Sequence, residues 1–187
     1  MSTATENLGL AAVAGTWTID PTHTTIGFSV RHAMVSKVRG TFGEFAGSLT
    51  IDGSDLTASS AELTIQAASI DTGNADRDGH LASPDFLDVE NFPTLTFTST
   101  GVVVDGPDVA LTGDLTIHGV TRPVTVNYEY VGSSIDPFGF TRVGFEGTAK
   151  ISRKDFGLVW NAALETGGVL VGDEITLILD VEAVKQA

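Results

Sequence analysis

The stretch EITLILDVEA, residues 174–183, decides the fold of this chain. Apolar side chains occupy every second position in it, at Ile175, Leu177, Leu179 and Val181. A β-strand points successive side chains to opposite faces, so a period of two buries one face and leaves the other to water. Such half-buried strands are typical of antiparallel sheets.

Four further stretches repeat this alternation. They are TIGFSVRH (25–32), AELTIQ (61–66), TLTFTST (94–100) and VTVNYEY (124–130). Short turn-forming motifs lie between the alternating stretches, at Asp52-Gly53, Asp105-Gly106-Pro107, His118-Gly119, Asp136-Pro137 and Gly167-Gly168. Many short strands joined by hairpin turns are typical of barrels and sandwiches. We therefore expect an all-β fold of about eight to ten strands.

Composition excludes several classes of protein. The chain has 187 residues, of which 42% are hydrophobic, as one globular domain would have. Its formal net charge of −14 repels phosphate backbones and anionic headgroups, so nucleic acid and stable docking on acidic membranes are not expected. The absence of cysteine excludes disulfides, thiolate nucleophiles and cysteine-based zinc sites.

The N-terminal residues 1–14 are expected to form a flexible leader before one barrel domain at residues 15–187. The first positively charged side chain is Arg31, so the leader lacks the basic segment that begins a secretory signal. This predicts a cytoplasmic protein. No apolar run reaches the roughly 18 residues needed to span a bilayer, so stable membrane insertion is not expected either.

The polar stretch TGNADRDGHLASPDFLD, residues 72–88, breaks the strand pattern. Ser83 can cap a helix, Pro84 suits the first helical position, and Asp85 favours the positive end of the helix dipole. We expect one or two short helices here, inserted in the β chain so that they cover one end of a barrel.

Arg77, Asp78 and His80 in this stretch admit two interpretations. Arg77 and His80 offer donors to an anionic or carbonyl headgroup, with Asp78 orienting one of them. Alternatively, the three side chains pair locally and fix the helix to the barrel. We favour the structural role, because perturbed ion pairs are often purely structural.

Catalytic and cofactor motifs are missing from the sequence. It has no phosphate-binding loop, no dinucleotide fingerprint, no Gly-x-Ser-x-Gly elbow and no His-Glu-x-x-His pair. No two histidines stand two or four apart, the spacings that place two metal ligands on one side of a strand or helix. We therefore expect no catalytic residue, no cofactor and no metal site. The four histidines are His23, His32, His80 and His118.

An ordered set of residues resembles one protein family. It comprises Trp17, Ile19, Asp20, His23, Ile26, Phe28, Val30 and His32, then Gly40-Thr41-Phe42 and Phe45-Ala46-Gly47, then Thr72-Gly73, Arg77-Asp78, His80-Leu81, Asp85-Phe86 and Phe92-Pro93, then Phe97-Thr98-Ser99, Gly113-Asp114-Leu115-Thr116, Gly119-Val120-Thr121, Pro123-Val124, and finally Arg153, Phe156 and Gly157. Over nearly the whole chain from Gly15, this set resembles the YceI-like family of polyisoprenoid-binding or lipid-binding domains.

The resemblance implies a lipocalin-like antiparallel β-barrel of about eight strands that holds a long apolar ligand. The implied ligand is a polyisoprenoid or an isoprenoid quinone, carried without catalysis, and some members form homodimers. Two alternatives stay open. One is an enzyme that acts on a lipid-like molecule through Arg77, Asp78 and His80, and the other is a ligand-free dimeric interaction module.

The candidate ligand-binding residues are the large apolar side chains expected to face the interior of the barrel. Each of them also serves an ordinary packed core, because side chains alone can fill a small barrel. They are Phe28, Val30, Phe42, Phe45, Leu63, Ile65, Phe86, Leu95, Phe97, Leu115, Ile117, Phe145 and Trp160.

Overall fold

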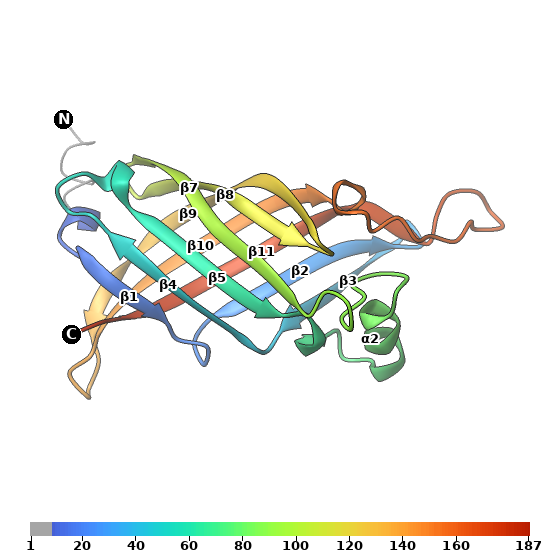
Figure 1. The fold of residues 1–187 in the computed structure, drawn as a ribbon, viewed down its shortest axis with the longest axis horizontal. Helices are drawn as coiled ribbons and strands as arrows, with labels where there is room; N and C mark the ends of the chain where they lie inside the picture. The colour runs from blue at the N-terminus through green and yellow to red at the C-terminus, as the bar shows by residue number, and fades with distance from the viewer. Residues whose placement is uncertain (1–8) are drawn as a thin grey trace.

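The computed structural model describes residues 9–187, and its strands form a closed antiparallel β-barrel (Figure 1). Eight strands follow one another around the ring, and pairing between the first and the last closes it. They are β1 (Gly15–Ile19), β4 (Phe45–Ile51), β5 (Ser60–Gln66), β7 (Thr94–Asp105), β8 (Asp108–Ile117), β9 (Val120–Ile135), β10 (Thr141–Ser152) and β11 (Val171–Lys185). The predicted all-β barrel of about eight strands is therefore confirmed.

Three more strand segments extend the ring at one end. Strand β11 pairs along one edge first with β2 (Thr25–His32) and then with β1, so these two segments share one position in the barrel. Strand β3 (Ser36–Phe42) returns from β2 and leads into β4, and the short β6 (Ile70–Asp71) pairs with β3. The β2–β3 hairpin therefore projects beyond the ring of eight (Figure 1).

The hairpin turns follow the residue types that the sequence provides. His118 and Gly119 join β8 to β9 with φ angles of 54° and 72°. A two-residue hairpin turn needs such left-handed angles to match the twist of its strands, and glycine adopts them without steric cost.

The polar insert forms one α-helix, α2 (Ala75–Ala82), beside three single 3-10 turns elsewhere, η1 (Leu56–Ala58), η2 (Ala67–Ser69) and η3 (Arg153–Phe156). Asn74 caps α2, with its side chain accepting a hydrogen bond from the backbone N–H of Arg77 at 3.0 Å. Ser83 ends this helix, because its N–H and hydroxyl both bond to the His80 carbonyl. A second helix starting at Ser83 does not form, and residues 83–93 make turns instead.

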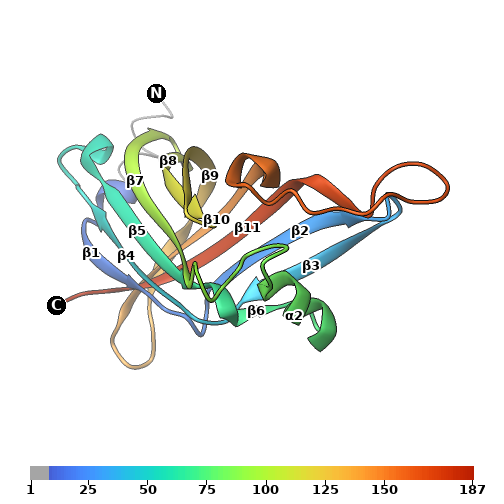
Figure 2. The same ribbon diagram turned by 45° about the vertical axis from the view of Figure 1, so that its right-hand side comes forward.

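The position of α2 agrees with the expectation that the inserted helix covers one end of the barrel. Figure 2 shows α2 beside β6, at the same end of the barrel as the base of the β2–β3 hairpin. No helix in residues 9–187 is long and apolar enough to cross a membrane.

The predicted flexible leader falls partly on residues 1–8, which lie outside the described residues. Residues 9–14 differ from that prediction, because Leu10 and Val13 are buried. The indole N–H of Trp17 donates a hydrogen bond of 3.0 Å to the Val13 carbonyl, which ties this segment to β1. The packed domain therefore begins before Gly15.

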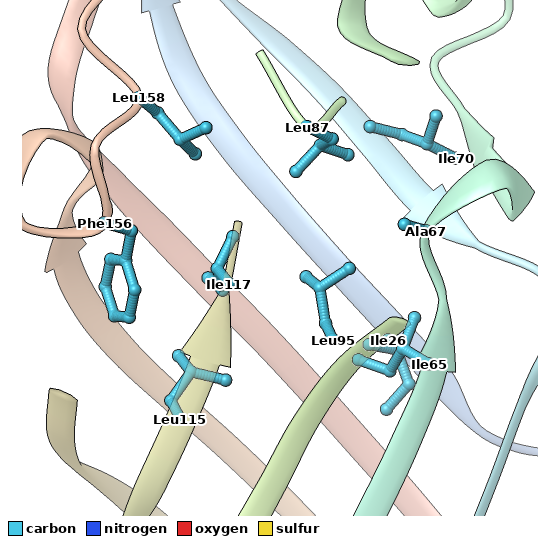
Figure 3. Packing of buried hydrophobic residues seen from close by; sticks show 10 residues of the cluster. All are labelled: Ile26, Ile65, Ala67, Ile70, Leu87, Leu95, Leu115, Ile117, Phe156 and Leu158. Carbon is cyan, nitrogen blue, oxygen red and sulfur yellow. The ribbon is translucent and has the colours of Figure 1, made fainter. Parts of the chain in front are cut away.

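The core is divided into two clusters of buried apolar residues. The first lies toward the α2 end and includes Leu87, Phe156 and Leu158 (Figure 3). The second includes Leu10, Trp17 and Val143. Trp17 of the second cluster is fully buried.

Candidate functional site

The barrel interior holds a cavity of about 250 Å³. Its wall includes residues of both core clusters, and almost all of its side chains are apolar. Along β11 it extends from Val171 to Val181, which is about 33 Å at roughly 3.3 Å per strand residue. A long, narrow, apolar cavity suits a chain-like apolar molecule better than a compact polar one.

Side chains on β11 show that this space is unfilled. Ile175, Leu177 and Leu179 line the cavity, and all three are only half-buried although they face the interior. Ala183, further along the same strand, is fully buried in the second cluster. Ala183 itself does not line the cavity, although Leu10, Ile51, Val102 and Val109 of the same cluster do.

The structure places most of the thirteen predicted ligand-binding side chains on the cavity wall. All of them except Phe45 and Trp160 line it. Phe45 packs against the first cluster instead. Trp160 packs against Phe86 with tilted rings and against His80 edge-on, at ring-centre distances of 5.3 and 4.7 Å. Contact of the wall with a ligand stays a prediction.

Several wall residues were missed by the sequence reasoning. Leu10 was assigned to the leader, and Ile19, Ile51 and Val109 were not predicted. The period of two along β8 (DVALTGDLTI) was a signal that could have identified Val109. Tyr128 also lines the wall, and its place in the alternating stretch VTVNYEY was a signal that could have identified it.

Tyr128 brings a polar group to the apolar wall. Burial raises the pKa of its hydroxyl well above the usual value. Its ring lies edge-on to Phe145, 6.3 Å between centres, and covers Gly147 on the paired strand, where an added Cβ would overlap the ring. Among residues 9–187 no protein group forms a hydrogen bond with the Tyr128 hydroxyl.

Arg77 and Asp78 form hydrogen bonds with Thr72, which precedes α2. The Arg77 side chain donates to the hydroxyl and carbonyl of Thr72 at 2.7 and 2.8 Å. Asp78 accepts from the Thr72 backbone N–H at 2.9 Å and also from its hydroxyl. Neither side chain lines the cavity. The two side chains therefore tie α2 to Thr72, the residue that follows β6. The structural role of the pair stays a prediction.

His80 also stays outside the cavity wall. Its Nε2 lies 2.9 Å from an Asp85 carboxylate oxygen, and its ring packs edge-on against Phe86 and Trp160. Leu81, Phe86 and Leu87 are the residues of the polar stretch that do reach the cavity. The insert therefore faces the interior with its apolar side chains.

Among residues 9–187, Arg153 is the most deeply buried charged residue, at 1% exposure. Its guanidinium donates to the carbonyls of Leu158, Trp160 and Gly172 at 2.7 to 2.8 Å, and to that of Val171 at 3.3 Å. Burial lowers its pKa, and Asp173 at 3.7 Å opposes this shift. One side chain thus holds the segment after η3 against the start of β11.

Asp20, His23 and Glu182 form a second polar cluster, with possible ligand atoms within 4.8 Å of one another. The Arg142 guanidinium lies between the carboxylates, 2.7 Å from Asp20 and 3.0 Å from Glu182, and also pairs with Asp136. Hydrogen bonds from His23, Thr22 and Arg142 hold the pKa of Asp20 far below its usual value. A positive charge already stands where a metal ion would bind, so we interpret the cluster as a structural ion-pair network.

Comparisons with known proteins agree with this geometry. Residues 17–183 match the model of the YceI-like domain. The chain is 42% identical over 178 residues to "Protein YceI" of Escherichia coli O17:K52:H18, covering 94% of this chain and 90% of that protein.

Two solved structures share the fold. Burkholderia cenocepacia BcnA has a TM-score of 0.77 at 24% identity, covering 88% of this chain and 98% of that one. A polyisoprenoid binding domain from Saccharophagus degradans, implicated in plant cell wall breakdown, has a TM-score of 0.69 at 16% identity, with coverage of 91% and 98%. With the family model and the relative at 42% identity, the barrel and its ordered motifs show that the chain belongs to the family of YceI-like domain proteins.

Proposed function

We propose that this protein binds and carries a long apolar molecule of the polyisoprenoid or isoprenoid quinone class inside its barrel, without catalysing a reaction on it. The observation that carries the proposal is the unfilled apolar cavity along β11. The Saccharophagus degradans structure, which is described as a polyisoprenoid binding domain, supports it as a protein of the same fold.

The energetics favour recognition of the apolar chain. Burial of one CH₂-sized group contributes about 0.8 kcal/mol, so an isoprene unit of five carbons contributes up to roughly 4 kcal/mol before entropy is subtracted. One hydrogen bond to a polar end group contributes only about 0.5–1.5 kcal/mol net. Affinity then rises with the length of chain that the cavity accepts, and selectivity for the end group is modest.

A carrier role agrees with the positions of the candidate catalytic residues. Arg77 and Asp78 are engaged with Thr72, and His80 is engaged with Asp85, all away from the cavity wall. An enzyme acting through them would need its substrate outside the barrel. The cytoplasmic location, the homodimer and the absence of a cofactor stay predictions from the sequence.

The test is identification of the molecule that the protein carries when it is isolated from its native host. Organic extraction followed by mass spectrometry is expected to yield an isoprenoid chain compound in a stoichiometric amount. The proposal fails if extracts contain no such compound and the purified protein also does not bind added geranylgeraniol. Conversion of an added isoprenoid to a product would favour the enzyme alternative.

We also propose that Tyr128 meets the polar end of the ligand, because a hydroxyl in an apolar wall gains from a hydrogen-bonding partner. Tyr128→Phe is expected to weaken binding of geranylgeraniol about threefold to tenfold, the equivalent of one hydrogen bond. Binding of the matching hydrocarbon, which has no hydroxyl, should not change. Equal losses for the alcohol and the hydrocarbon in fluorescence titrations would contradict this assignment.

A further inference from the structure

The β2–β3 hairpin concentrates positive charge in an acidic protein. The chain has 24 Asp and Glu residues, but none of them falls in residues 21–43. Of its ten Lys and Arg residues, three stand on this hairpin, at Arg31, Lys37 and Arg39. The net charge of −14 is therefore distributed unevenly, and it argues against anionic partners only for the rest of the surface.

The three basic side chains lie together on the outer face of the hairpin. Arg31 stands directly opposite Lys37, and Arg39 follows two residues later on the same face. All three are exposed, and none has an ion-pair partner among residues 9–187. Like charges placed directly opposite each other on paired strands destabilise a sheet.

Carboxylates on the neighbouring segment of β11 do not neutralise this charge. Asp173 pairs with Lys154 at 3.1 Å, and Glu174 pairs with Lys150 at 3.5 Å. The hairpin thus keeps an unneutralised positive face in a protein rich in carboxylates. Such a face is suited to an anionic partner outside the chain.

The turn of this hairpin is strained and apolar. Ala33 and Met34, two of the three residues between the strands, have φ angles of 49° and 64°, a left-handed region that glycine and asparagine adopt most readily. Met34 is 63% exposed and Val35 is 81% exposed. Left-handed backbone at non-glycine residues is unfavourable, so the turn presents its exposed apolar side chains on strained backbone.

Val169 in the loop before β11 adjoins this apolar surface, and the same loop also carries the exposed carboxylate of Glu165. The Ala33 N–H donates to the Leu170 carbonyl at 2.7 Å, and the Met34 sulfur packs directly on Gly168. Val169 is 42% exposed. We call Met34, Val35 and Val169 the apolar tip. Figure 1 shows the β2–β3 turn and this loop together at one end of the barrel.

We propose that the apolar tip and the basic face of the β2–β3 hairpin dock the protein on a bilayer that contains anionic phospholipids. Exposed apolar side chains flanked by basic ones bind at the membrane interface, with the apolar groups at the acyl boundary and the cations among the headgroups. Strand β11 is about 50 Å long at roughly 3.3 Å per residue. Carboxylates at the far end are thus several Debye lengths, each about 8–10 Å, from the membrane.

Docking at this end would bring the cavity to the bilayer. The cavity reaches Val30 and Val171, and Val171 pairs with His32, the residue of β2 next to the turn of the hairpin. Transfer of an apolar chain between bilayer and barrel rests on the proposed function, but attachment of the protein to the membrane does not. The two ideas can therefore fail separately.

The first test is co-sedimentation of the full chain with vesicles. Phosphatidylcholine vesicles that contain phosphatidylglycerol should bind the protein, and vesicles of phosphatidylcholine alone should bind it far less. Each basic residue near an anionic surface contributes about a fivefold gain in binding. Lys37→Gln with Arg39→Gln should thus lower partitioning by at least about tenfold, and raised salt should have the same effect on the unmodified protein.

The second test removes the apolar tip and has a matched control. Met34→Ser with Val35→Ser should lower vesicle binding to a similar extent. Ile135→Ser with Phe138→Ser removes two side chains that are 72% and 84% exposed on the β9–β10 hairpin, and it should leave binding unchanged.

Three outcomes would overturn the proposal. The unmodified protein fails to bind the anionic vesicles, or the control variant loses as much binding as the tip variant. In the third, the tip variant changes the sedimentation coefficient of the free protein but not its vesicle binding, which would make the tip a contact between copies of the chain. Extraction of the carried molecule tests the proposed function independently of all three.

Discussion

Replacing Arg153 with methionine is expected to lower the free energy of unfolding by about 3–5 kcal/mol, because the substitution leaves buried carbonyl groups without their donor. Four backbone carbonyls accept from this guanidinium, and the side chain is 1% exposed. For a chain of this size the loss corresponds to a fall in Tm of about 6–20 °C. Urea unfolding followed by circular dichroism measures it.

Lys154 is the matched control for this prediction. It is the next residue along the chain, its side chain is 54% exposed, and its ion pair with Asp173 lies at the surface. Lys154→Met should change stability by no more than about 0.5 kcal/mol. Arg153→Lys should fall between the two, because a lysine keeps the charge but cannot reach carbonyls on two segments at once. Equal stability of all three variants would show that the buried guanidinium is dispensable.

The role of Arg153 also shows where the sequence stopped being informative. The glycine in ISRKDFGLVW (151–160) is a sequence signal for a bend, and Gly157 adopts a left-handed φ of 76° at the end of η3. The partners of Arg153 are backbone carbonyls, however. Every residue has one, so the sequence does not reveal which carbonyls accept from this side chain. The fold was therefore predictable here, and the contacts that hold it were not.

The alternation along β11 predicted the barrel but not the state of its interior. A period of two assigns Leu177 and Leu179 to the inner face whether the core is solid or hollow. The difference depends on how side chains from several strands meet across the barrel, as where Leu179 stands opposite Gly147 on β10. Pairings between residues far apart in sequence are invisible to a local pattern, and so the cavity required the structure.

The local positive charge of residues 21–43 can be read from the sequence, but the net charge of the whole chain hides it. The value of −14 describes the whole surface, and it led to the expectation that acidic membranes repel the protein. Residues 21–43, taken by themselves, contain no Asp or Glu, and a count of charge over short segments of the sequence detects this. Only the strand register, however, places Arg31 opposite Lys37 and separates them from Val30, which faces the cavity.

Filling the cavity should abolish most of the binding of a chain-like ligand without unfolding the barrel. Leu179 is half-buried on the wall, so Leu179→Trp extends a larger side chain into unfilled space instead of a packed core. Exclusion of one isoprene unit removes up to roughly 4 kcal/mol, so the Kd for geranylgeraniol should rise between about tenfold and a thousandfold. Fluorescence titration of the protein, after any carried ligand has been removed, measures this change in Kd.

Ile178 supplies the control, because it is the adjacent residue on β11, is also half-buried, and does not line the cavity. Ile178→Trp adds a similar side chain on the other face of the strand and should leave the Kd within about twofold, since a surface change has little effect on a distant contact. If both tryptophan variants bind geranylgeraniol as the unmodified protein does, the ligand does not occupy the barrel. If only Leu179→Trp loses binding while its unfolding curve is unchanged, the loss comes from the tryptophan filling the cavity. A general loss of structure would lower both ligand binding and the stability of the variant.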